Sequence, residues 1–433
     1  MPESTSLICL AGKIIYSVAG DTEKIEENAL NDIASKTKVL TFADIINLPP
    51  VEKERLGLSH TPQEINQQPS TWRETFNLLN NIQPDVKRFL ENSGLGSSSL
   101  TVSLIGAGTS DYIGRALAAI LKKEWRCQVN VVPSTDMLTE MDDIVASSPD
   151  GTRHIWISFS RSGDSFEGVT VIQAALEKYP QINHLVVTCN KNGKMATELC
   201  VGRSNAFCIT LDDKVNDRGL AMTSSFTNMV IIGQALANIL DLDPYRPVVD
   251  TLAFVAENAL TDIASLASII AEQNYSRICF LGTGTLRAVG DESALKVMEL
   301  TAGHYSVMSE SFLGLRHGPL SWLNEDSLVV GFISNNIEKQ KIEIGLLEEL
   351  KNKNAAKSIL AILPHENGEV SKYSDYQLIL NIPDTLDDAY RPPVDILFAQ
   401  CLGLFASLRR HLRPDAPSAD GKIQRVVSQI NGA

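Results

Sequence analysis

The chain repeats one series of apolar strands, and this repeat constrains the fold more than any other feature of the sequence. The segment Ile278-Cys-Phe-Leu-Gly-Thr-Gly-Thr285 matches Ser103-Leu-Ile-Gly-Ala-Gly-Thr109, and Gly282 lies 176 residues beyond Gly106. Three later apolar segments, at 328–333, 359–363 and 378–382, lie 171 to 174 residues beyond Ile155, Leu185 and Phe207. Amphipathic helical patterns separate the strands, so the series predicts parallel sheets whose strands are joined by helices.

The repeat predicts an α/β fold with two duplicated domains. We expect each domain to be a three-layer α/β/α sandwich around a five-stranded parallel sheet, at residues 96–245 and 246–433. Prolines at 244 and 247 place the connection at Asp241–Val249. Residues 1–95 read as a helical segment that precedes the repeat. A chain of 433 residues with 44% hydrophobic content can bury a core of this size.

Composition argues against nucleic acid and membranes as partners. The 38 Lys and Arg against 52 Asp and Glu give a net charge of −14, which repels both kinds of polyanionic surface. The apolar patch Leu7–Ala11 is too short for a signal peptide, and no stretch approaches 18 apolar residues. Seven cysteines are scattered without a C-x-x-C pair, which is typical of reduced thiols. We therefore expect a cytoplasmic protein.

Two strand-end loops of the first repeat are rich in hydroxyl side chains. Gly106-Ala-Gly-Thr-Ser110 and Ser160-Arg-Ser-Gly-Asp-Ser165 each follow a strand and begin a helix, where free N–H groups favour a phosphate. Ser and Gly also form ordinary turns and caps, but the second repeat has Leu286 and Ser334-Asn-Asn336 instead. A dinucleotide is disfavoured because the third glycine of its motif is absent. We predict that phosphate binds the serines of the first repeat: Ser110, Ser160, Ser162 and Ser165.

A second candidate is the helix that follows Gly284. Glu292, Lys296 and Glu299 are spaced i, i+4 and i+7 and so lie on one face of a helix that is otherwise largely apolar. A narrow charged stripe of this kind indicates burial, which shifts the pKa of a carboxylate and makes it useful as a base. The alternative is an exposed Glu–Lys pair.

Downstream of this helix, His317 lies between Arg316 and a Gly-Pro turn and could carry a proton near neutral pH, although it could equally be structural. No histidines or cysteines have metal-ligand spacing. We therefore predict no metal and no cofactor.

These motifs resemble those of the sugar isomerase (SIS) domain family, and in particular the isomerase half of glucosamine-6-phosphate synthase. The resemblance runs from about Glu64-Ile-Asn-Gln-Gln-Pro69, similar to the family's E-I-x-x-Q-P helix, to the C-terminus. Within the family the chain is similar to AgaS-type galactosamine-6-phosphate deaminase/isomerases, also described as tagatose-6-phosphate ketose/aldose isomerases. Four segments carry this likeness: Asp217-Arg218, Met222-Thr-Ser-Ser-Phe226, Glu310-Ser-Phe-Leu-Gly-Leu-Arg-His317 and Gly421-Lys-Ile-Gln-Arg-Val-Val427.

The resemblance implies a role for each matching position. Glu299 would be the base that moves a proton between C1 and C2, while Glu292 and Lys296 would hold sugar hydroxyls and tune the base. His317 would assist ring opening from the neighbouring subunit, as in the synthase, which implies a homodimer with active sites near the subunit interface. The remaining positions would bind the substrate: Thr109, Ser110, Ser160, Ser162 and Ser165 at the phosphate, with Arg161, Thr223 and Ser224 nearby.

The resemblance leaves one position open. The synthase has a C-terminal lysine that forms a Schiff base, and it matches either Lys422 or Arg425, depending on a small gap. An arginine could not form the imine, because it stays protonated. Arg161 and Ser224 also depart from the synthase, which has glutamine and lysine there.

Three functions follow from these observations. The first is an enzyme that converts galactosamine 6-phosphate to tagatose 6-phosphate and ammonia. The second is an aldose–ketose isomerase of tagatose 6-phosphate or another hexose phosphate. The third is a sugar-phosphate sensor without chemistry, which is disfavoured because residues 1–95 contain no basic DNA-binding module.

Overall fold

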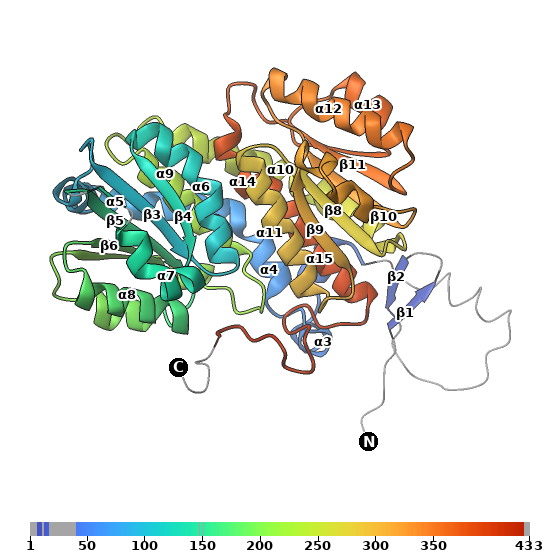
Figure 1. The fold of residues 1–433 in the computed structure, drawn as a ribbon. Coiled ribbons are helices and arrows are strands. Elements are labelled where there is room, and N and C mark those ends of the chain that lie inside the picture. The colour runs from blue at the N-terminus through green and yellow to red at the C-terminus, as the bar shows by residue number, and fades with distance from the viewer. Residues whose placement is uncertain (1–6, 11–12, 17–39, 147, 150, 428–433) are drawn as a thin grey trace, which may run out of the picture.

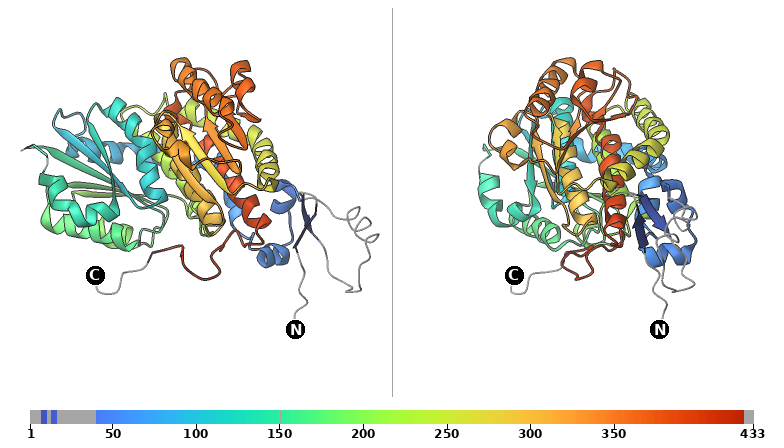
Figure 2. Two further views of the ribbon diagram at one scale, coloured as in Figure 1. Left: turned by 45° about the vertical axis from the view of Figure 1, so that its right-hand side comes forward. Right: turned by 90° about the vertical axis from the view of Figure 1, so that its right-hand side faces the viewer.

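The computed structural model describes residues 7–10, 13–16, 40–146, 148–149 and 151–427 (Figure 1). Two five-stranded parallel sheets form the centres of two domains that lie side by side, the first drawn in teal to green and the second in yellow to red (Figure 2). The predicted α/β fold with two duplicated domains is therefore confirmed. The predicted bounds 1–95, 96–245 and 246–433 stay predictions.

The first sheet has the strand order β4-β3-β5-β6-β7. The central strands β3 and β5 are buried along almost their whole length, because helices cover both faces of the sheet, and such burial is typical of parallel strands. The strands are β3 (Leu100–Gly106), β4 (Gln128–Pro133), β5 (Arg153–Ser160), β6 (Asn183–Thr188) and β7 (Ala206–Thr210). Helices α5, α6 and α9 cover one face, and α7 and α8 cover the other (Figure 1). The helices are α5 (Gln68–Ser93), α6 (Thr109–Trp125), α7 (Ser134–Ala146), α8 (Phe166–Lys178) and α9 (Ser224–Ala237).

The second sheet repeats the topology of the first, in the order β9-β8-β10-β11-β12. Its strands are β8 (Arg277–Gly282), β9 (Ser306–Ser311), β10 (Ser327–Phe332), β11 (Ser358–Leu363) and β12 (Tyr376–Ile379). Its helices are α10 (Arg246–Glu272), α11 (Thr285–Leu300), α12 (Ile337–Asn352), α13 (Gly368–Tyr373), α14 (Pro392–Asp395) and α15 (Leu397–Arg409). The polar strand β9 has no counterpart among the predicted strands.

The likeness extends to the backbone of single residues. Gly108 precedes α6 with φ 56° and ψ −126°, and Gly284 precedes α11 with φ 61° and ψ −125°. Both angles lie in a region that only glycine adopts without strain. The two glycines therefore let each first strand turn abruptly into its helix.

Short helices and a hairpin precede the first sheet. The helices are α2 (Phe42–Ile46), α3 (Pro50–Leu56) and α4 (Thr61–Asn66), and α5 follows them. Residues 7–16 contain two antiparallel strands, β1 (Leu7–Leu10) and β2 (Lys13–Tyr16), where helix and loop were predicted. The remainder of the segment before residue 40 lies outside the described residues.

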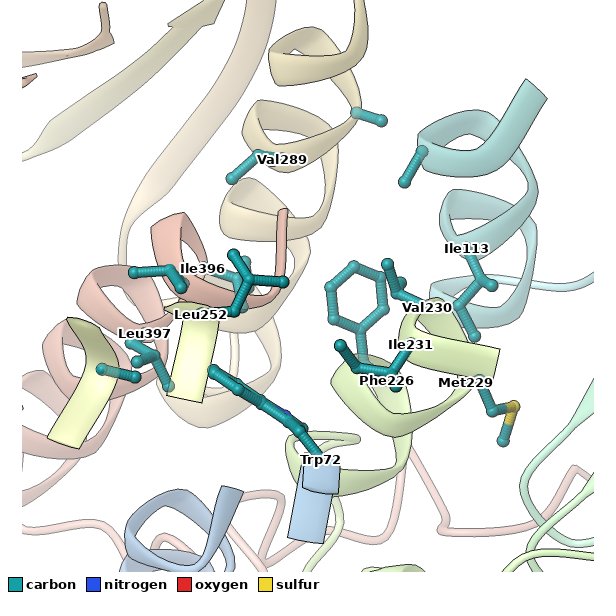
Figure 3. Packing of buried hydrophobic residues seen from close by; sticks show 14 of the residues in the cluster. Trp72, Ile113, Phe226, Met229, Val230, Ile231, Leu252, Val289, Ile396 and Leu397 are labelled. Atoms are coloured by element: carbon teal, nitrogen blue, oxygen red, sulfur yellow. The ribbon is translucent and has the colours of Figure 1, made fainter. Parts of the chain in front are cut away.

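One apolar core joins the two domains. Figure 3 shows Phe226 and Ile113 of the first domain in the same cluster as Val289 and Ile396 of the second, with Trp72 of α5 below them. Helix α10 is long and apolar enough to cross a membrane by length and composition, but it packs against α5 and α15 in this core. The shared core fixes α6 of the first domain against α11 of the second.

Candidate active site

The crevice of the first domain opens between β3 and β5, which are neighbours in the sheet. The chain leaves β3 for a helix on one face and β5 for a helix on the other, so the two loops diverge at the carboxyl end of the sheet. Ligands of open α/β sheets bind at such points. Gly106 makes the first loop tight, because a Cβ atom there would lie 2.3 Å from the backbone of Ser110.

A cavity of about 130 Å³ lies in this crevice and is lined by hydroxyl groups. The Oγ atoms of Ser160 and Ser162 accept backbone N–H groups of their own turn, so both O–H groups can donate elsewhere. Ser165 is the N-cap of α8 and makes no capping hydrogen bond. The cavity brings together Ser110, Ser160, Arg161, Ser162, Ser165 and Arg425, with the unpredicted Ser134 and Met222. This lining suits a small anion.

A second cavity of about 490 Å³ adjoins the first and contains the predicted base. The two share Ala107, Arg161, Met222, Arg425 and Val427 in their linings. The second is also lined by Thr109, Glu299 and Lys422. A ligand with an anionic end in the first cavity would therefore extend toward the Glu299 carboxylate.

Behind Glu299 lies a buried cluster of charges on α11. The Lys296 ammonium lies 2.5 Å from Glu299 Oε2, 3.3 Å from Glu292 Oε1 and 3.0 Å from Thr109 Oγ1. Burial raises the pKa of Glu292 to about 8, an effect that Lys296 opposes. Burial works against the ammonium too, but the two carboxylates raise the pKa of Lys296.

The cluster lies behind the surfaces of the two cavities. The side chains of Glu292 and Lys296 are fully buried and line neither cavity. Their polar contacts in this structure are with each other, Glu299 and Thr109, and their predicted role at the sugar hydroxyls stays a prediction. Thr109, the first residue of α6, donates to Glu292 Oε1 and accepts from Lys296, so it links the loop of the first domain to the base of the second.

The C-terminal tail, residues 412–427, runs from α15 back to the first domain (Figure 1). Its residues 421–425 and 427 line the second cavity. Arg425 lines both cavities, and its guanidinium is engaged by hydrogen bonds to Asp217 O and Asn216 Oδ1, at 2.7 and 2.6 Å. Lys422 is exposed on the cavity lining and pairs with Asp420. Of the two candidates for the C-terminal lysine, Lys422 is thus the one whose side chain is available.

Three predicted residues lie apart from the cavities. Thr223 and Ser224 begin α9, where their backbone N–H groups donate to the Asp217 carboxylate, and both are buried behind the crevice. His317 follows the 3-10 turn Gly314–Arg316 after β9 and is exposed. It lines neither cavity of its own chain.

The matching strand end of the second domain carries a carboxylate of the chain itself. Asp388 accepts hydrogen bonds from the Ser334 hydroxyl and from Asn335 N, and it pairs with Lys339 and Arg391. Although burial opposes ionisation, Arg391 and these donors lower the pKa of Asp388. A hydroxyl, a backbone N–H group and cations at the end of β10 therefore already hold an anion.

Within the described parts of the chain, no three His, Cys, Asp or Glu side chains gather as a metal site. The duplicated sheets, the hydroxyl-lined crevice and the adjoining carboxylate are typical of α/β proteins that bind small phosphorylated ligands. The chain belongs to the SIS domain family, which matches residues 97–239 and 269–402. The predicted family membership is thereby confirmed.

Individual relatives agree with this assignment. The D-galactosamine-6-phosphate deaminase AgaS of Escherichia coli is 32% identical over 374 residues, which cover 86% of this chain and 94% of the relative. The protein of the same name from Shewanella sp. strain ANA-3 is 31% identical over 378 residues, covering 87% and 92%. The crystal structure of tagatose-6-phosphate ketose/aldose isomerase from Escherichia coli is similar with a TM-score of 0.74, 29% identity and coverage of 86% and 97%.

Proposed function

We propose that the chain converts galactosamine 6-phosphate to tagatose 6-phosphate and ammonia. The observation that carries the proposal is the position of Glu299, whose carboxylate lines a cavity continuous with the serine-lined crevice and lies 2.5 Å from a buried ammonium. The two AgaS relatives, which carry the name of this activity and span nearly their full length on this chain, support the same substrate.

The proposed reaction begins with the open-chain sugar, its phosphate in the serine-lined crevice. Glu299 removes the proton from C2, which leaves an enaminol across C1 and C2, and the proton returns to C1. The product is a ketimine at C2 with a hydroxymethyl group at C1. Water adds to the ketimine, and ammonia leaves to give the ketose. Lys296 holds the Glu299 carboxylate in place during these transfers.

The tail supplies the third part of the proposed site. We place Lys422 in the role of the family's C-terminal lysine, because the Arg425 side chain is engaged with the backbone near residue 217. The Lys422 amine would contact the sugar near C1.

A homodimer completes the proposal. His317 is exposed on its own chain, and the resemblance to the synthase would bring it to the Glu299 site of a second subunit. The six cysteines from Cys127 to Cys401 are free thiols, which fits action in the cytoplasm.

The assay that tests the reaction follows ammonia and ketose from three substrates, galactosamine, glucosamine and tagatose 6-phosphates. Ammonia release from galactosamine 6-phosphate is expected. Conversion of tagatose 6-phosphate to an aldose without ammonia release would instead support the isomerase named for the Escherichia coli structure. Glu299→Gln is expected to abolish the reaction, while Glu338→Gln on the exposed face of α12 leaves it unchanged.

Mixing two inactive variants tests the dimer. If His317 acts across the interface, a heterodimer of Glu299→Gln and His317→Ala chains contains one intact site, and random exchange restores roughly a quarter of the wild-type activity. No recovery after exchange, which mass measurement of the mixed dimers would verify, would place both residues in one chain.

A further inference from the structure

A buried carboxyl group from the segment before the first sheet contacts the rear of the active site. Glu64 of α4 is 6% exposed, and its Oε1 accepts hydrogen bonds from the backbone N–H groups of Arg218 and Gly219. The other oxygen, Oε2, accepts no hydrogen bond within the described residues. The contact spans 154 residues of sequence and serves neither a helix cap nor an ion pair.

The 216–220 loop contacts Glu64 on one side and, through Leu220, lines the second cavity on the other. Its carbonyl groups accept from two arginines: Arg161 donates to Leu220 O at 3.0 Å, and Arg425 donates to Asp217 O at 2.7 Å. Arg161 also donates to the carbonyl of Arg425 at 2.6 Å. The loop is therefore held at its N–H groups by Glu64 and at its carbonyl groups by the arginines that fix the tail.

The 216–220 loop lies directly against α4, and one further backbone bond, from Leu220 N to Asp415 O at 3.0 Å, joins it to the tail. A Cβ atom at Gly219 would lie 2.7 Å from Thr61 Oγ1 and 3.0 Å from Glu64 Oε2, so the loop rests directly on α4. Without the carboxyl group, two buried N–H groups would lose their acceptor, which favours any conformation in which the loop moves outward to water. The tail bonds of Arg425 would be lost with it.

We propose that Glu64 is a positioning residue that acts through the 216–220 loop to hold the C-terminal tail, and with it Lys422, over the Glu299 cavity. Only the expected change in KM rests on the proposed function; the position of the tail does not. Burial, and next the nearby Asp217, raise the pKa of Glu64 to about 8, so a neutral amide is a close substitute. Glutamine offers the same acceptor oxygen, whereas alanine offers none.

The experiment compares Glu64→Ala, Glu64→Gln and the matched control Glu91→Ala, an exposed carboxylate at the end of α5. Tryptic cleavage after Lys422, followed by mass spectrometry without substrate, is expected to be about tenfold faster in Glu64→Ala, because local opening sets the rate. Glu64→Gln and Glu91→Ala should match the wild type. In the assay of sugar phosphate turnover, Glu64→Ala is expected to raise KM about tenfold with a smaller change in kcat, and Glu64→Gln to restore it.

A double-mutant cycle with Arg425→Ala identifies the route. If both residues act through the 216–220 loop, the double variant is cleaved no faster than the faster single variant. Independent, multiplying effects would overturn the proposal, as would wild-type cleavage in Glu64→Ala or equal losses in Glu64→Gln and Glu64→Ala. If Glu64→Ala does not fold, Glu64→Asp, which withdraws the acceptor by one carbon, takes its place. Failure of the proposed function would abolish turnover but leave the cleavage result intact.

Discussion

Replacing Lys296 by methionine tests two effects of the buried charge cluster: its contribution to the unfolding free energy and its support of the proposed base Glu299. The ammonium lies 2.5 Å from Glu299, 3.3 Å from Glu292 and 3.0 Å from Thr109, and its side chain is 0% exposed. Removing one partner of a buried ion pair costs about 3–5 kcal/mol, because the remaining charge has no compensation. Since burial raises the pKa of Glu292 to about 8, that carboxyl is largely neutral at pH 6. We expect a larger cost in unfolding free energy at pH 8, where Glu292 is about half ionised, than at pH 6.

Denaturant unfolding at both pH values measures this cost. The control is Lys353→Met, which breaks an exposed ion pair at the end of α12 and should cost about 0–1 kcal/mol. A Glu292→Gln/Lys296→Met double variant removes both charges and should regain most of the stability. Turnover should stay about a hundredfold low in both variants, because Glu299 has lost its ammonium partner. A loss below about 1 kcal/mol for Lys296→Met at pH 8, or no recovery in the double variant, would refute the reasoning.

Three further outcomes can be measured. Thr109→Val removes the hydroxyl shared by Lys296 and Glu292 and should lower kcat about tenfold, whereas Thr109→Ser should retain most of it; equal losses would contradict the shared contact. Asp388→Gly removes the carboxylate at the end of β10 and should lower the thermal midpoint of unfolding. Formate or sulfate, but not chloride, should restore part of the loss, and recovery in all three salts would point to a general salt effect. The folded-state pKa values of Glu64 and Glu292, about 8 against an ordinary 4.5, mean that their stabilisation is complete below pH 4.5 and is lost as the pH rises through 8. The slope is about 1.4 kcal/mol per pH unit for each group, so Glu64→Gln should show a shallower decline in unfolding free energy than the wild type, and an identical decline would contradict the assignment.

Most of the fold could be predicted because the buried strands carry their own signal. A run such as Ile155–Phe159 is apolar at four of its five positions and buried at all of them, since helices cover both faces of the sheet. Strand β9, Ser306–Ser311, lacked this signal because it lies at the sheet edge and its residues are only partly buried. The repeat predicted two sheets of the same kind, while the strand order, β4-β3-β5-β6-β7 in the first sheet, came only from the structure.

The predicted and the unpredicted parts of the site also differ in whether their signal is local in the sequence. The serines that follow β5 could be predicted because strand ends, turns and helix starts are local features of the sequence. The direction of the Arg425 side chain could not be predicted, because it is set by a carbonyl group more than 200 residues away in the sequence. The same holds for Glu64 and for Asp388, whose partners come together only in the folded chain.

The hydrogen bond between Thr109 and Lys296 has a consequence for how the two copies of the repeat can diverge. It joins the first turn of α6 to the middle of α11, so neither copy can exchange its half of the bond without a matching change in the other. Among homologous proteins, a substitution at position 109, 292 or 296 is expected to be accompanied by substitutions at the other two positions. Among the residues that the structure describes, the crevice serines Ser160 and Ser162 bond within their own turn, and their variation should follow the chemistry of the substrate instead.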